Sequence, residues 1–329
     1  MAKVGIIGAG SWGCALALLL HKNGNKVTVW SALKSEIEGL RVNREHPALA
    51  GVKFPEDVLL VDLLTDAVNG MDFIVMAVAS PYVRKTASSL KDLVTPGLII
   101  VNVAKGIEEK TLLTMSEVIE SEIPQANVTV LSGPSHAEEV GRGIPTTIVI
   151  GAKVFETAEY LQNVFMSEVF RVYSNDDVKG IELGAALKNV VALAAGMADG
   201  LGYGDNTKAA LITRGIAEIA RLGVAMGCNV DTFYGLSGIG DLIVTCASAH
   251  SRNRRAGILI GQGKSMDEAM EEVKMVVEGV YSAKAGLALA DRYKVATPII
   301  EQVNAILFEG KEPARAVREL MLRDKKAED

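Results

Sequence analysis

The 329-residue sequence has little cysteine and little histidine. Its three cysteines, Cys14, Cys228 and Cys246, lie far apart and form no CxxC pair, and its four histidines are scattered along the chain. This spacing argues against a disulfide framework and against a metal site built from paired ligands. The sequence therefore predicts reduced thiols, no metal and a cytoplasmic protein.

A strong charge of one sign and a membrane-spanning run are also missing. The net charge is −6, with 22% charged and 49% hydrophobic residues, which is typical of a globular protein and argues against nucleic-acid binding. Glycines interrupt the apolar N-terminus, so a signal peptide is not expected. The most apolar stretch, Leu183–Leu201, contains Lys188, Asn189 and Asp199 and therefore predicts a buried core helix rather than a membrane insertion.

Short apolar runs alternate with helix-length segments in the first half of the chain. The runs expected to form buried strands are Val4–Ile7, Lys26–Trp30, Phe73–Val78, Leu98–Val103, Thr129–Leu131 and Thr147–Ile150. This alternation indicates parallel strands joined by crossover helices. Since the chain is long enough for two domains, residues 1–175 are predicted to form a doubly wound, Rossmann-type α/β domain.

Only helical patterns follow after about Asn175, so residues 176–329 are predicted to form an all-α domain, with the boundary within Ser174–Gly180. The expected helices are Asp177–Gly200, Asn206–Met226, Asp231–Leu236, Asn253–Gln262, Ser265–Lys274, Ser282–Tyr293, Pro298–Glu309 and Pro313–Leu322.

A G-x-G-x-x-G sequence directly follows the first predicted strand and opens a helix. Gly8 permits a tight turn, Gly10 lets the backbone approach a pyrophosphate, and Gly13 allows close packing of the helix on the strand. The helix start at Ser11 and Trp12 offers N–H groups and partial positive charge to phosphates. A bare glycine turn is the alternative, but the strand–loop–helix–strand order favours a dinucleotide site.

The second predicted strand ends in Trp30-Ser31-Ala32, with no acidic residue to bind the adenosine ribose and favour NAD. Ser31 could donate one hydrogen bond to a 2′-phosphate. Lys34, the nearest cation, could attract it weakly unless it is simply a solvated surface lysine. The sequence predicts that both NADP and NAD are accepted, with a modest preference for NADPH.

Polar residues follow two further strands. Lys105 follows one of them, and Ser132-Gly133-Pro134-Ser135 follows the next. Ligands bind beyond the carboxyl ends of strands in open α/β sheets, so Lys105 is well placed for an anion.

Lys188 and Asn189 interrupt a helix of Ala, Val, Leu and Gly. Lys188 could extend its ammonium to solvent. Alternatively, a buried lysine could protonate a carbonyl oxygen during reduction by hydride, and Asp241 could hold its charge. Ser251-Arg252-Asn253 begins a helix and suits a phosphate, although a solvated basic turn is the alternative.

Eight segments in order resemble bacterial NAD(P)-dependent glycerol-3-phosphate dehydrogenase over nearly the whole chain. They are GAGSWG (8–13), NVAKGIE (102–108), LSGPSHAEEV (131–140), ELGAALKNVVALAAG (182–196), GDNTKAALITRG (204–215), GLSGIGDLIVTC (235–246), SRNRRAG (251–257) and VVEGV (276–280). The resemblance implies interconversion of dihydroxyacetone phosphate and sn-glycerol 3-phosphate, a small phosphorylated triose, at the entry to glycerophospholipid synthesis. It also implies a homodimer.

The resemblance assigns Lys188 as the proton donor and acceptor. It places around the substrate Lys105, Gly133, Ser135, Asn189, Asp241, Thr245, Ser251, Arg252 and Asn253. It places around the cofactor Ser11, Trp12, Lys105, Ala137, Arg252, Val276 and Glu278, together with Gly8, Gly10 and Gly13. This chain departs from the family at Ser31-Ala32, where relatives commonly have His or Arg after the tryptophan, so the contacts at the adenosine end are open.

Two other functions stay open at this point. A β-hydroxyacid dehydrogenase of the 6-phosphogluconate dehydrogenase type shares the architecture and a Lys-Asn pair, but typically has an S-G-G turn where this chain has Ser132-Gly133-Pro134-Ser135. A non-catalytic dinucleotide sensor would not need Lys188, Asp241 and Arg252 together.

Overall fold

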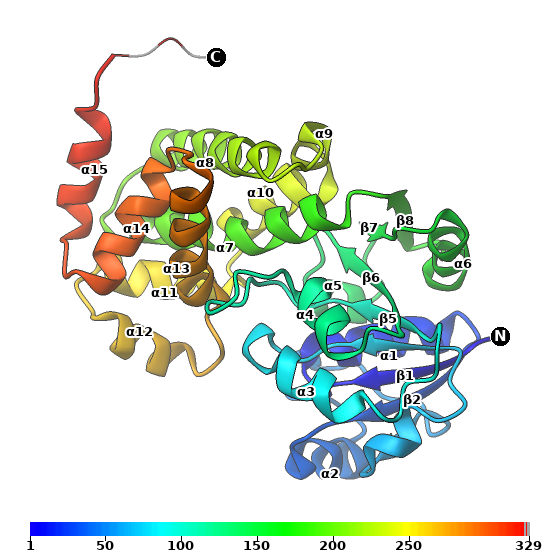
Figure 1. Ribbon diagram of the computed structural model, residues 1–329. Coiled ribbons are helices and arrows are strands. Elements are labelled where there is room, and N and C mark those ends of the chain that lie inside the picture. Colours follow the sequence, from blue (N-terminus) through cyan, green and yellow to red (C-terminus); the bar gives the residue numbers. More distant parts are fainter. Residues whose placement is uncertain (326, 328–329) are drawn as a thin grey trace. The chain divides into compact units, whose positions relative to one another are not determined.

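The computed structural model describes residues 1–325 and 327, and the chain divides into two compact units. Unit 1 comprises Met1–Glu108 and Leu113–Glu182. Unit 2 comprises Glu109–Leu112 and the described chain from Leu183 onward. The last positions of the predicted helical domain, 326 and 328–329, lie outside the described residues. Figure 1 traces the elements of both units along the chain.

Unit 1 contains an eight-stranded sheet with the strand order β3-β2-β1-β4-β5-β6-β7-β8. The strands are β1 (Lys3–Ile7), β2 (Lys26–Trp30), β3 (Leu59–Val61), β4 (Phe73–Met76), β5 (Ile99–Asn102), β6 (Asn127–Ser132), β7 (Thr146–Gly151) and β8 (Phe170–Asn175). The first six are parallel. The strand order reverses between β1 and β4, and this reversal is where a doubly wound sheet binds its ligand.

Helices cover both faces of this sheet, because alternate strand residues are buried on opposite sides. The helices of unit 1 are α1 (Ser11–Lys22), α2 (Lys34–Asn43), α3 (Val83–Leu90), α4 (Met115–Glu122), α5 (Ala137–Gly141) and α6 (Phe155–Phe165). One hydrophobic core joins α1, α2, α5 and α6 to the sheet, and the other joins α3 and α4. The predicted doubly wound fold is confirmed.

The direction of β7 was predicted wrongly: it runs antiparallel to β6 and parallel to β8. The intervening helix, α5, has five residues and spans about 8 Å, whereas six strand residues span about 20 Å. Because α5 is too short to return the chain along the sheet, β7 runs back from the end of β6.

Two strands at the edges of the sheet were not predicted. β3 has three residues, and in β8 buried and exposed positions alternate at first. An edge strand covered on one face lacks the continuous apolar run by which the central strands were recognised.

The helices of unit 2 pack around α7 (Val178–Gly200), which begins in unit 1. The others are α8 (Asp205–Ala225), α9 (Val230–Tyr234), α10 (Asp241–Ala247), α11 (Arg252–Gly261), α12 (Met266–Val273), α13 (Glu278–Tyr293), α14 (Pro298–Phe308) and α15 (Pro313–Met321). By length and composition α7 could cross a membrane, but its most apolar stretch is entirely buried inside the protein. The core-helix interpretation is therefore confirmed.

Glu218 of α8 is a buried carboxyl that accepts hydrogen bonds from the backbone N–H of Ile299, at the start of α14. Burial raises the pKa of Glu218 to about 7, against the opposing effect of the backbone hydrogen bonds from Ile299 and Ile300. The folded protein therefore binds this proton more tightly than the unfolded chain does, and stability falls as pH rises from about 4.5 to about 7.

We expect Glu218→Gln to be more stable relative to the wild type at pH 8 than at pH 5. Glutamine keeps an acceptor oxygen but never has to ionise while buried. The change in this difference should be on the order of 3 kcal/mol or less, at about 1.4 kcal/mol per pKa unit. Thermal unfolding of both proteins at the two pH values measures it, and a difference independent of pH would contradict the assignment.

Candidate active site

The loop between β1 and α1 has the geometry of a phosphate cradle. Gly8 has a φ of 121°, and a Cβ there would lie 2.6 Å from the carbonyl oxygen of Ala77. A Cβ on Gly13 would lie 2.1 Å from the carbonyl oxygen of Gly8, so the first turn of α1 packs directly on the loop. Space in front of Gly10 is open, and among the described residues none caps α1 with a side chain. The N–H groups of Ser11 and its neighbours are thus available to an anion.

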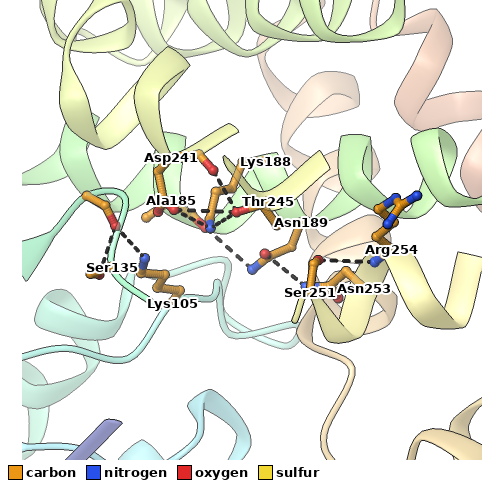
Figure 2. A network of polar contacts seen from close by, with 11 residues as sticks. Lys105, Ser135, Ala185, Lys188, Asn189, Asp241, Thr245, Ser251, Asn253 and Arg254 are labelled. Carbon is orange, nitrogen blue, oxygen red and sulfur yellow. Dashed lines mark hydrogen bonds and ion pairs between the residues drawn. The ribbon is translucent and has the colours of Figure 1, made fainter. Parts of the chain in front are cut away.

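The carboxyl ends of β5 and β6 bring together three of the predicted substrate residues. The Lys105 ammonium donates a hydrogen bond to the carbonyl oxygen of Gly133 at 3.2 Å, and the Ser135 hydroxyl donates to the same oxygen at 2.9 Å (Figure 2). Ala137 begins α5 shortly after them. The ammonium of Lys105 therefore lies at the carboxyl ends of the strands, where the sequence predicted an anion site.

A buried carboxylate that was not predicted from the sequence binds the residue at the carboxyl end of β5. Glu182 accepts hydrogen bonds on Oε1 from the Asn102 amide at 2.7 Å and from the N–H and hydroxyl of Ser116, both at 2.9 Å. The Asn102 side-chain oxygen accepts from the N–H of Ala104, next to Lys105. Burial raises the pKa of Glu182 to about 7, while hydrogen bonds, among them those from Ser116 and Asn102, limit the rise. Its lone acidic position in an apolar stretch was the signal that could have revealed it.

In unit 2, Lys188 does not reach solvent: it is 5% exposed and forms an ion pair with Asp241, which is 2% exposed. The ammonium lies 2.6 Å from the Asp241 carboxylate and 2.5 Å from the Thr245 hydroxyl (Figure 2). Thr245 in turn donates to the backbone carbonyl of Asp241 at 2.6 Å. The carboxylate and the hydroxyl direct the buried ammonium, and a positioned ammonium can act as a proton donor.

A π-helical turn, Leu236–Gly240, places Asp241 at the start of α10. The turn passes very close to α9, because a Cβ on Gly238 would lie 2.0 Å from the carbonyl oxygen of Phe233. Neither this turn nor α10 was predicted. A seven-residue helix that follows three closely spaced turn-forming residues is too short to show a clear helical periodicity of apolar residues. The sequence motif at residues 235–246 was recognised, but its helical backbone conformation was not predicted.

Asn253 joins three helices of unit 2. Its amide donates to the side-chain oxygen of Asn189 on α7 at 2.9 Å, and its oxygen accepts from the N–H of Gly279 on α13 at 2.8 Å. Gly279 follows Glu278, and Val276 lies just ahead of α13. The Asn253 amide thus connects Asn189, predicted to touch the substrate, with the start of α13, where the predicted cofactor residue Glu278 lies.

Glycines set the distance between α7 and α11. A Cβ on Gly196 would lie 2.1 Å from the carbonyl oxygen of Arg254, and one on Gly257 would lie 2.2 Å from that of Leu193. Gly200 and Gly261 are equally close to the opposite backbone one turn later. Because the two backbones touch, the start of α11 is held beside the α7 segment that contains Asn189.

The start of α11 has the polar groups predicted for a phosphate site. Ser251 caps the helix by accepting from the N–H of Arg254, and the Arg254 guanidinium binds Asp199 of α7 at 2.7 Å. Lys208 binds the other oxygen of Asp199 at 2.9 Å. Arg252 is half-buried and, within the described part of the chain, no other residue binds its guanidinium. Arg252 is therefore available to an anion while Arg254 anchors the helix.

No metal site accompanies these groups in the part of the chain that the structure describes, where no three His, Cys, Asp or Glu side chains gather.

Comparison with known proteins gives consistent matches for both halves of the chain. The family model of the NAD-dependent glycerol-3-phosphate dehydrogenase N-terminus matches residues 3–158, and that of the C-terminus matches residues 177–318. The chain is 61% identical to glycerol-3-phosphate dehydrogenase [NAD(P)+] of Fusobacterium nucleatum, with 100% of this chain and 99% of that protein aligned. It is also 61% identical to the enzyme of the same name from Agathobacter rectalis, with 100% and 98% aligned.

A solved structure gives the same result. The crystal structure of glycerol-3-phosphate dehydrogenase from Coxiella burnetii superimposes with a TM-score of 0.94 at 36% identity, over 98% of this chain and 99% of that one. This chain belongs to the NAD-dependent glycerol-3-phosphate dehydrogenase family.

Proposed function

We infer that this chain is an oxidoreductase that interconverts dihydroxyacetone phosphate and sn-glycerol 3-phosphate with NAD(P)H. The observation that supports this most directly is the buried Lys188–Asp241–Thr245 group, in a chain that matches both halves of the family. We propose that residues 1–175 bind the dinucleotide and that residues 176–329 supply the catalytic and most of the substrate-binding groups.

The β1–α1 loop fits a dinucleotide. Ser11, Trp12 and Gly13 would hold the pyrophosphate through their N–H groups, because Gly10 leaves the backbone open and no described side chain occupies the helix end. We propose that Ala137, Lys105, Val276, Glu278 and Arg252 complete the cofactor contacts. When bound, NAD(P)H supplies the hydride that reduces the C2 carbonyl of dihydroxyacetone phosphate.

Lys188 is proposed to give the proton that the C2 oxygen takes up as the carbonyl becomes an alcohol, and to remove it in the reverse direction. Asp241 stabilises the ammonium, and Thr245 fixes the direction of the Lys188 side chain. The other groups proposed to surround the substrate are Lys105, Gly133, Ser135, Asn189, Ser251, Arg252 and Asn253.

We expect Arg252→Ala to lower kcat/KM for dihydroxyacetone phosphate by roughly 10- to 150-fold, the loss of a hydrogen bond between charged groups. Unphosphorylated dihydroxyacetone should lose far less, because it has no charge for the guanidinium to bind. Steady-state kinetics with both substrates measure the difference. Arg255→Ala, on the exposed side of α11, is the matched control, and equal losses on both substrates would refute the phosphate role.

Oxidation of NADH and NADPH by the purified protein with dihydroxyacetone phosphate tests the function itself. Turnover with this substrate distinguishes the proposal from a β-hydroxyacid dehydrogenase, which would require a carboxylate substrate, and from a dinucleotide sensor, which would bind cofactor without turnover.

We also propose a cytoplasmic homodimer whose product supplies glycerophospholipid synthesis. The dimer is what the resemblance to the family implies. The cytoplasmic location is supported by the burial of the one helix, among the described residues, that is long and apolar enough to span a membrane. Light scattering of the purified protein tests the dimer, and a monomer mass would refute it.

A further inference from the structure

A carboxylate lies at the end of β2, although the sequence has no acidic residue directly after that strand. The buried Ser31 hydroxyl donates a hydrogen bond of 2.5 Å to Glu36, which is half-buried in the first turn of α2. Ser31 also accepts from the N–H of Leu33. These contacts close the loop after β2 and turn the Glu36 carboxylate back toward the strand end.

This carboxylate lies close to the dinucleotide loop. The N–H of Gly8 donates to the carbonyl of Trp30, so the loop and the end of β2 are directly joined. The Cys14 thiol donates to the carbonyl of Ala9 in the same loop. Burial raises the pKa of Cys14 to about 12, and the negative charge of Glu36 adds to the effect. Glu36 is therefore held beside the loop by Ser31, which directly follows Trp30.

The adenosine ribose of a dinucleotide lies at this point of a Rossmann domain, and an acidic group there binds the ribose 2′-hydroxyl. We propose that Glu36 is the residue that sets cofactor specificity, by accepting a hydrogen bond from the 2′-hydroxyl of NAD(H) and repelling the 2′-phosphate of NADP(H). The inference rests on the proposed dinucleotide site, and it reverses the modest NADPH preference predicted from the sequence.

The nearby cations offer a 2′-phosphate little compensation. Lys34 is exposed, so water and salt screen its charge. The Arg41 guanidinium is already bound to the Asp62 carboxylate and to the carbonyl of Leu60 in β3. Ser31, which could have donated to the phosphate, donates to Glu36 instead.

The test is the ratio of the dissociation constants of NADPH and NADH, measured by calorimetry without substrate. We expect the wild type to bind NADH roughly 10- to 100-fold more tightly, the scale of a hydrogen bond to a charged group. Glu36→Gln should bring the ratio to within about threefold of unity, since a neutral amide no longer repels the phosphate. The ratio for Ser31→Ala, which frees the carboxylate, should lie between the two.

Glu38→Gln is the matched control, because it removes an exposed carboxylate from the same helix and should leave the wild-type ratio unchanged. Tighter binding of NADPH by the wild type, or an unchanged ratio in both Glu36→Gln and Ser31→Ala, would overturn the inference. Failure of the proposed function would look different: both cofactors would bind with the expected ratio, but dihydroxyacetone phosphate would not be reduced.

Discussion

Replacing Lys188 with alanine is expected to lower kcat by about 10²- to 10⁴-fold, the usual contribution of a general acid. The side chain is 5% exposed and its ammonium is held by Asp241 and Thr245. Alanine has no group that could donate the proton in its place. Dissociation constants for NADH should change little, because the proposed pyrophosphate site lies in the loop of Gly8–Gly13.

Steady-state and binding measurements on Lys188→Ala test both halves of this prediction. Lys284→Ala, which removes an exposed lysine from α13, serves as the control. A variant that keeps more than about a tenth of the wild-type kcat would exclude Lys188 as the proton donor.

Asp241→Asn is expected to be the second most damaging change. It leaves a buried ammonium without its counter-charge, and breaking a buried ion pair in this way typically costs about 3–5 kcal/mol of stability. Activity should fall at least about 100-fold, because the same ammonium loses the partner that fixes its charge and direction.

A double variant separates this effect from a simple loss of packing. Lys188→Met combined with Asp241→Asn leaves no buried charge in the pair, so it should be more stable than Asp241→Asn alone. Denaturant unfolding of the single and double variants provides the comparison, with Asp231→Asn on the exposed side of α9 as control. Additive losses of stability would mean that the two charges do not depend on each other.

Lys188 could be recognised from sequence because a lysine inside an otherwise apolar helix is a local contradiction. Glu182, six positions earlier, is likewise a charged residue in an apolar segment. Its role becomes visible only from its hydrogen bonds with Asn102 and Ser116, which are 80 and 66 residues away in the chain. Its role at the carboxyl end of β5 depends on contacts between distant segments, which the residue pattern of a single helix cannot predict.

The sequence by itself determined the Rossmann-type sheet, the helical second half and the phosphate loop. Buried strands, amphipathic helices and glycine turns follow from the local alternation of apolar and polar residues and from the conformations open to glycine. The tertiary structure alone decided the antiparallel direction of β7, the contacts of Glu182 with Asn102 and Ser116, and the position of Glu36 at the end of β2. These features depend on which surfaces meet when distant segments pack, and the partner of a side chain is then set by distance in space rather than by position in the chain.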